Sequence, residues 1–87
     1  MTYAVYILPA AARALTRLPR ASQLRIRARI DSLAEQPRPE GVKKLAGTDE
    51  LYRVRAGDYR IVYQVRDERL VVLVIRIGHR REVYRGL

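Results

Sequence analysis

The segment Leu70–Ile77 constrains the fold of this chain more than any other part of the sequence. Nearly every position in it is apolar, so apolar side chains point to both faces of the strand that it predicts. Such a strand lies in the centre of a sheet or is covered on both faces. Upstream, Leu51–Ala56 and Tyr59–Arg66 alternate between apolar and polar residues, and Gly57-Asp58 and Asp67-Glu68 predict turns between the segments. The C-terminal half therefore predicts three consecutive strands joined by tight turns.

The N-terminal half predicts one strand followed by two helices. Thr2–Leu8 alternates as a strand does, and Pro9 suits the first turn of a helix because its missing N–H would be unpaired there. Pro19 ends that helix and opens a longer one that runs to about Gln36, and Pro37–Glu50 is expected to be a loop. The order β-α-α-β-β-β predicts an α+β fold in which a two-helix hairpin packs on a largely antiparallel four-stranded sheet.

The length and composition restrict the classes of protein that fit. The 87 residues suffice for a single domain, which we expect to span residues 1–87. Cysteine is absent and histidine occurs once, which excludes disulfides and argues against a zinc site, so we expect no metal and no cofactor. No apolar run is long enough to span a bilayer and no signal peptide is recognisable, so the sequence predicts a cytoplasmic protein without a membrane partner.

The charge indicates the kind of partner. The chain carries a formal net charge of +9, and sixteen of its eighteen cationic side chains are arginines. Such a field attracts polyanions, and nucleic acid, an acidic protein segment and an anionic membrane surface would all satisfy it. Arginine grips phosphate with two parallel hydrogen bonds and stacks on bases, which favours nucleic acid. Most arginines of the two helices are expected to form a solvated outer surface.

Two basic clusters are candidates for a site. If Gly57-Asp58 is a two-residue turn, Arg55 lies directly opposite Arg60, and Arg53 shares the face of Arg55. Like charges in this arrangement destabilise a sheet, so a bound phosphate would explain them, although the side chains could also spread into solvent. The second cluster is the tail, whose residue types suit RNA as phosphate ligand, proton carrier and stacking platform, or else form a solvated end. Its members are His79, Arg80, Arg81 and Tyr84.

An enzyme with these side chains would suit RNA as its substrate. RNA supplies its own nucleophile, the 2′-OH, so the protein has only to position the strand, stabilise the charge that develops on phosphorus and move protons. Histidine has an ordinary pKa near 6.5, which suits proton transfer. His79 is therefore the candidate proton carrier, and a structural residue at the end of a strand is the alternative.

These motifs resemble the RelE branch of the RelE/ParE toxin superfamily. The resemblance rests on Leu51–Tyr63 and Ile77–Tyr84, with support from Pro37–Pro39 and Lys43–Gly47. It implies an mRNA interferase that cuts mRNA at the ribosomal A site and forms a hetero-oligomer with a small antitoxin. The implied catalytic residues are Arg60, Arg80 or Arg81, and Tyr84, with RNA phosphate bound by Arg53, Arg55, Lys43 and Lys44.

Two other functions remain open from the sequence. ParE-like members of the superfamily share the fold but poison DNA gyrase instead of cutting RNA. A basic domain that binds nucleic acid without cleaving it is the second alternative. The clustered arginines and the tail favour the nuclease branch, because an RNA phosphate site needs such a convergence of cations. The antitoxin is expected to contribute an acidic or amphipathic segment that covers the basic sheet face or displaces the tail.

Overall fold

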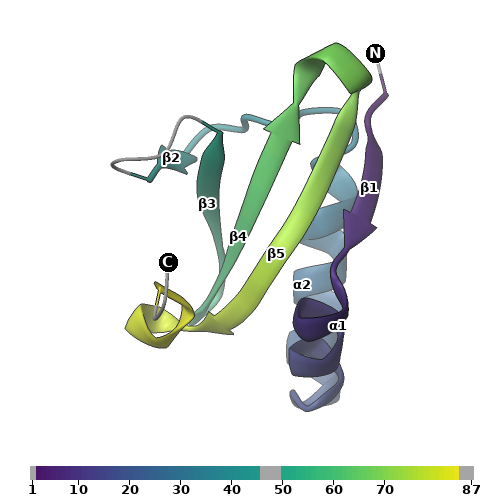
Figure 1. The fold of residues 1–87 in the computed structure, drawn as a ribbon. Helices are drawn as coiled ribbons and strands as arrows, with labels where there is room; N and C mark the ends of the chain where they lie inside the picture. The colour runs from purple at the N-terminus through teal and green to yellow at the C-terminus, as the bar shows by residue number, and fades with distance from the viewer. Residues whose placement is uncertain (1, 46–49, 85–87) are drawn as a thin grey trace.

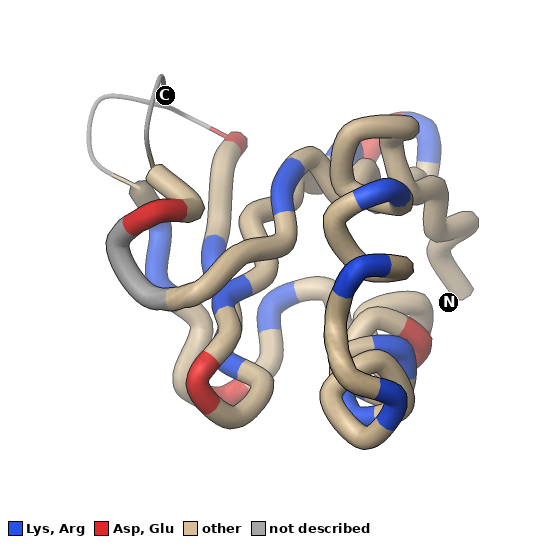
Figure 2. Tube along the Cα trace, turned by 90° about the horizontal axis from the view of Figure 1, so that it is seen from below, with Lys and Arg blue, Asp and Glu red and all other residues tan. Residues whose placement is uncertain are grey.

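The computed structural model describes residues 2–45 and 50–84, the side chains of residues 80 and 81 excepted. Two helices pack on one face of a five-stranded sheet, and the 3₁₀ turn η2 (Arg80–Tyr84) lies away from them, beside the opposite face (Figure 1). Lys and Arg are spread over both layers and outnumber Asp and Glu (Figure 2). The elements in chain order are β1 (Ala4–Ile7), α1 (Pro9–Thr16), α2 (Arg20–Ser32), β2 (Lys43–Lys44), β3 (Leu51–Ala56), β4 (Tyr59–Arg66), the 3₁₀ turn η1 (Asp67–Arg69), β5 (Val71–His79) and the 3₁₀ turn η2 (Arg80–Tyr84).

The sheet has the strand order β1-β5-β4-β3-β2. Strand β1 pairs parallel to β5 and every other pair is antiparallel, so the predicted α+β class is confirmed and the apolar strand β5 has a neighbour on each side. The strand count differs from the expected four because Lys43–Lys44 pairs with Arg53 and Tyr52 as a fifth strand. Helix α2 also ends at Ser32 instead of near Gln36.

The core fills the space between the helices and the sheet. Leu15 of α1 and Ile26 of α2 are fully buried against the inward side chains of β3, β4 and β5. The largest buried side chain is Tyr63, whose ring stacks on that of Tyr52 with centroids 5.9 Å apart. Burial raises the pKa of Tyr63, so its hydroxyl stays protonated and donates a hydrogen bond of 2.6 Å to the carbonyl oxygen of Pro37. This contact fixes the segment that follows α2 to the centre of the sheet.

A β-bulge in β5 changes which side chains face the helices. Tyr63 lies opposite Val74, whereas the preceding Val62 lies opposite Arg76, so Ile75 is an extra residue in β5. Because side chains alternate along a strand, one extra residue reverses the alternation beyond it. In β5, even-numbered residues face the helices before the bulge and odd-numbered residues face them after it. The side chain of Arg76 therefore points away from the core.

A hydrogen-bonded network ties distant parts of the chain together at the end of the sheet near η1. The carboxylate of Asp67 accepts a hydrogen bond of 2.6 Å from the hydroxyl of Tyr3 and two, of 3.0 and 2.8 Å, from the guanidinium of Arg38. Arg38 also donates through Nε to the hydroxyl of Tyr52 at 3.0 Å. Hydrogen bonds from Arg38 and then Tyr3 lower the pKa of Asp67 to about 2.

This network predicts a loss of stability in acid. Because the folded-state pKa of Asp67 is depressed, its contribution is present above the unfolded value of about 4 and is lost as the pH falls through about 2. Asp67→Asn should therefore lower the Tm at neutral pH and flatten the dependence of Tm on pH in that acid window. Asp31→Asn, which removes an exposed carboxylate without a side-chain hydrogen bond, is the control. An unchanged acid dependence in Asp67→Asn would contradict the assignment.

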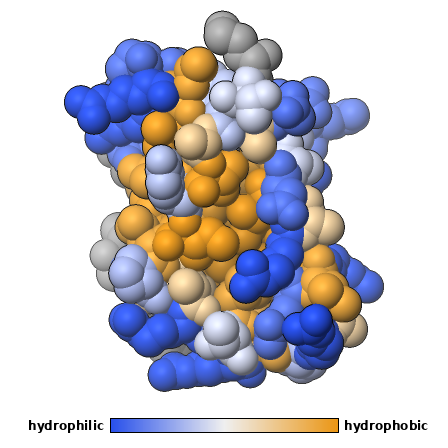
Figure 3. Space-filling model, turned by 90° about the vertical axis from the view of Figure 1, so that its right-hand side faces the viewer, coloured by the Kyte–Doolittle hydropathy of each residue, from blue (hydrophilic) through white to orange (hydrophobic). Residues whose placement is uncertain are grey.

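The side of the molecule that carries β1 and the helices is partly apolar. Figure 3 shows hydrophobic residues gathered on this side, with hydrophilic residues above and below them. Tyr6, Leu8 and Leu24 are large hydrophobic side chains that remain exposed. Strand β1 is an edge strand, so one side of its backbone is open to pairing. Within residues 2–45 and 50–84, no helix is long and apolar enough to cross a membrane.

Candidate functional site

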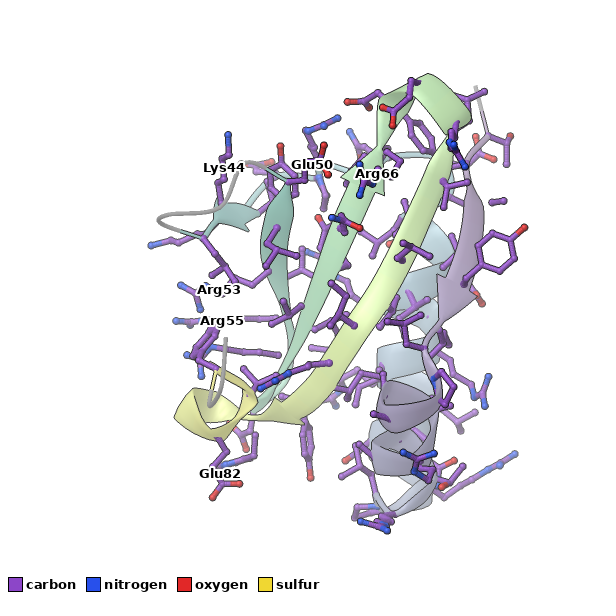
Figure 4. The ribbon with its side chains drawn as sticks, in the orientation of Figure 1. Lys44, Glu50, Arg53, Arg55, Arg66 and Glu82 are labelled. Atoms are coloured by element: carbon purple, nitrogen blue, oxygen red, sulfur yellow. The ribbon has the colours of Figure 1, made fainter. Side chains whose placement is uncertain are left out.

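An arginine cluster occupies the sheet face opposite the helices. Val54 and Ala56 of β3 point into the core, so the alternating side chains of Arg53 and Arg55 point to the other face. The Gly57-Asp58 turn places Arg55 directly opposite Arg60, as the sequence predicts. Figure 4 shows Arg53 and Arg55 projecting from β3 on the side away from the helices. We call Arg53, Arg55 and Arg60 the arginine cluster.

No acidic side chain neutralises this cluster within the described part of the chain. The ion pairs of the structure join Arg38 to Asp67 and Arg66 to Glu50, and neither involves the cluster. The Nε atom of Arg60 is buried and has no hydrogen-bond partner. Buried polar groups are nearly always hydrogen-bonded, and guanidinium groups bind phosphate oxygens with particular strength. The cluster can therefore bind a phosphodiester without first breaking an internal ion pair.

The tail closes over one end of this face. Turn η2 packs on β4 and β5, and its Val83 is buried against Gly78 of β5. A Cβ atom at Gly78 would lie only 3.3 Å from the Cβ of Val83, so the absence of a side chain permits this close approach. The Nη1 atom of Arg76 lies 3.5 Å from the carbonyl oxygen of Val83 and helps to hold the turn. Half-buried Tyr84, whose hydroxyl has no partner in the described chain, follows at once.

The other basic residues expected at the site are placed differently. Lys43 pairs with Arg53 and shares its face, whereas Lys44 pairs with Tyr52 and belongs to the opposite face. Figure 4 shows Lys44 pointing away from Arg53 and Arg55. The backbone of residues 80 and 81 lies in η2, but the side chains of Arg80 and Arg81 lie outside the described residues.

His79 is not brought together with the arginine cluster. It pairs with Tyr59, and its imidazole contacts the Tyr59 ring edge to face with centroids 5.4 Å apart. Since Tyr59 packs against the core, both rings lie on the helix side of the sheet. The bulge at Ile75 is the cause, because without it His79 would have pointed to the arginine side. Arg76, which sequence reasoning did not select, takes a place on that side instead.

The arginine cluster should reduce the stability of the folded chain. Arg55 and Arg60 face each other directly, and like charges at such positions repel. Arg55→Gln is therefore expected to raise the free energy of unfolding by about 0.5 kcal/mol. Denaturant unfolding of the free protein would measure the change at low salt, with Arg27→Gln as the control because Arg27 is an exposed arginine of α2 that opposes no cation across a strand pair. An equal change in the free energy of unfolding in Arg55→Gln and Arg27→Gln would contradict this expectation.

Comparisons with known proteins agree on one family. Residues 5–84 match the model of the ParE toxin of type II toxin–antitoxin systems. The mRNA interferase toxin RelE of Escherichia coli is 41% identical over 63 residues, which cover 68% of this chain and 65% of that protein. The structure of the archaeal RelE–RelB complex from Pyrococcus horikoshii matches with 37% identity and a TM-score of 0.82, covering 93% of this chain and 98% of that one. The toxin–antitoxin complex RelBE2 of Mycobacterium tuberculosis matches with 27% identity and a TM-score of 0.81, covering 92% and 100%.

Proposed function

Because this chain belongs to the RelE/ParE family of type II toxins, we propose that it is an endoribonuclease that cleaves mRNA on the ribosome. The observation that carries the proposal is the arginine cluster, in which three guanidinium groups share one face without acidic partners in the described chain. Fold alone does not separate nucleases from gyrase poisons within this family. A convergence of free guanidinium groups is what binding and cleaving a phosphodiester requires.

The proposed reaction is an internal displacement at phosphorus. The 2′-oxygen of the substrate attacks the adjacent phosphorus, its proton is released, and the 5′-oxygen of the next nucleotide leaves and takes up a proton. The products carry a 2′,3′-cyclic phosphate and a 5′-hydroxyl. Arg60 and Arg55 hold the phosphate and stabilise the negative charge that develops on it. Arg53 and Lys43 bind a neighbouring phosphate, and Tyr84 stacks on a base.

Proton transfer is assigned outside the arginine cluster. Guanidinium groups have pKa values above about 12 and remain protonated at neutral pH, so they stabilise charge but do not accept the proton. His79 lies on the opposite face of the sheet and is therefore left out of the proposed site. A group of the ribosome then takes the proton from the 2′-OH, and this assignment predicts that cleavage requires the ribosome. Arg80 or Arg81 remains a predicted catalytic residue of the tail.

The second part of the proposal is a cognate antitoxin that forms a hetero-oligomer with this chain. The relatives from Pyrococcus and Mycobacterium were solved as toxin–antitoxin complexes. The net charge of +9 favours an acidic segment over the arginine cluster and makes its association rate sensitive to salt. The exposed apolar side chains of Leu8 and Leu24 offer a surface for an amphipathic segment.

Expression of the chain without its antitoxin tests the proposed activity against the gyrase alternative. Inhibition of gyrase is the second candidate because the matching family model describes a ParE toxin. We expect incorporation of labelled amino acids to stop first, and mRNA to accumulate breaks with 5′-hydroxyl ends. An Arg55→Gln, Arg60→Gln double variant serves as the control and should permit growth. Loss of DNA supercoiling before any loss of translation would favour the gyrase alternative and reject the nuclease.

A further inference from the structure

The basic surface continues past the arginine cluster, around the edge of β3, onto helix α2. Strand β2 pairs only with Tyr52 and Arg53, so the outer edge of β3 has no strand beside it from Val54 onward within the described chain. Two adjoining grooves follow this edge. One is lined by Arg25, Ala28, Arg29, Ser32, Arg55 and Ala56, and the other by Arg29, Gly41, Lys43, Arg53, Val54 and Arg55.

Two arginines of α2 take part in these grooves. Arg29 lines both, and its Nε atom is buried without a hydrogen-bond partner. Arg25, one helical turn earlier, extends across the groove so far that its Nη1 atom lies 2.7 Å from where a Cβ atom of Gly57 would be. Neither has an acidic partner among the described residues. Arg29 is half-buried and therefore departs from the solvated outer surface that is expected for most arginines of the helices, while Arg25 stays exposed along the groove.

We propose that this groove binds the sugar–phosphate backbone of single-stranded RNA that flanks the cleavage site. The inference rests on the proposed function, because Arg53 and Arg55 belong to both the arginine cluster and the groove walls. A strand whose phosphates bind at the cluster thus passes directly between β3 and α2. Guanidinium groups on both walls provide bidentate donors for successive phosphates, and the small side chains Ala28 and Ala56 leave room for ribose between them.

Binding of non-cleavable RNA tests the inference separately from cleavage. The probes are 2′-O-methyl oligonucleotides of about 3 and about 20 nucleotides, of which only the longer can occupy cluster and groove together. For the long probe, R25Q/R29Q should weaken binding roughly tenfold at physiological salt and lower the slope of log K against log salt by about 1.4, the value for two lost phosphate contacts on a single strand. Binding of the short probe should not change.

The matched control removes the same charge from the same helix. R20Q/R27Q replaces two exposed arginines of α2 that line neither groove, and it should leave both the affinity and the salt slope for the long probe as in the wild type. Because Arg29 is partly buried, R25Q alone serves as a second variant that changes only an exposed side chain, and it should lower the slope by about 0.7.

Three outcomes would overturn the proposal, and a fourth would reject only the proposed function. Equal losses in R25Q/R29Q and R20Q/R27Q would show a general effect of net charge, and a wild-type protein that binds the two probes equally well would show that the groove holds no RNA. If R25Q/R29Q weakens binding of polyglutamate but not of the long oligonucleotide, the groove takes an acidic protein segment instead. If the wild type never cleaves RNA but the expected losses of binding occur, the proposed function fails while the groove assignment stands.

Discussion

Replacing Arg60 with glutamine is expected to slow cleavage of RNA on the ribosome by about 10²–10³-fold, the usual effect of losing one preorganised donor to a developing negative charge. Arg60 opens β4 directly opposite Arg55, and its Nε atom is buried without a partner in the described chain. The Arg60 side chain is therefore partly enclosed by the fold before substrate binds. Glutamine remains polar but is shorter, and it removes the charge and the bidentate geometry. Single-turnover cleavage by purified toxin would measure the rate.

The control for Arg60→Gln is His79→Gln, on the opposite face of the same end of the sheet. Tyr59 and Arg60 are neighbours in β4, and His79 contacts the ring of Tyr59 on the helix side. We expect His79→Gln to cleave at close to the wild-type rate and to keep the same pH–rate profile. A steep loss in His79→Gln with normal cleavage by Arg60→Gln would reject the proposed site and return proton transfer to the histidine.

The sequence predicts most of the fold because its strands and turns have strong local signals. The turn at Gly57-Asp58 sets the register of β3 and β4, and the prediction that Arg55 opposes Arg60 is confirmed. Strand β2 was not predicted, because the Lys43–Lys44 pair has neither alternation nor the β-branched residues that mark strands. Lys43 and Lys44 form a strand because they pair with Arg53 and Tyr52 of β3, and the local sequence does not show this pairing.

The orientation of the tail was harder to predict, and the cause is the bulge. A strand that is apolar on both faces has no alternation to show which residues face the helices. The apolar residues of Leu70–Ile77 therefore give no sign of an extra residue at Ile75. The one charged residue in that run, Arg76, was the available signal. A buried charge is costly, so Arg76 has to reach the arginine side, and His79, three residues on, must then point to the helices.

The arginines of α2 illustrate a second limit. Helical periodicity separates Ile26 and Ile30, which enter the core, from Arg25 and Arg29, which do not. Helical periodicity does not reveal which residues lie beside the polar face of the helix. Those neighbours depend on how the helix packs against a strand that is far away in the sequence. The contact of Arg25 with the turn at Gly57 is of this kind.

Tyr63, on the face of β4 that points to the helices, is expected to affect the stability of the fold and not cleavage. Tyr63→Ala removes a fully buried ring from the centre of the core and should lower the free energy of unfolding by about 3–5 kcal/mol. Native proteins are stable by only about 5–15 kcal/mol, so this loss removes a large share of the stability and should lower the Tm markedly. Tyr63→Phe keeps the ring and loses only the 2.6 Å hydrogen bond to Pro37, at a cost of about 1 kcal/mol.

The same variants separate stability from catalysis along one strand. Because Tyr63 points to the helices and Arg60 to the opposite face, Tyr63→Phe should cleave RNA at the wild-type rate per folded molecule. Arg60→Gln removes the same like-charge repulsion as Arg55→Gln, so it should be at least as stable as the wild type. Denaturant unfolding and single-turnover cleavage on the same preparations measure both properties. If Tyr63→Phe lost cleavage in proportion to Arg60→Gln while remaining folded, the two faces of β4 would not be independent and the site would have to include the core.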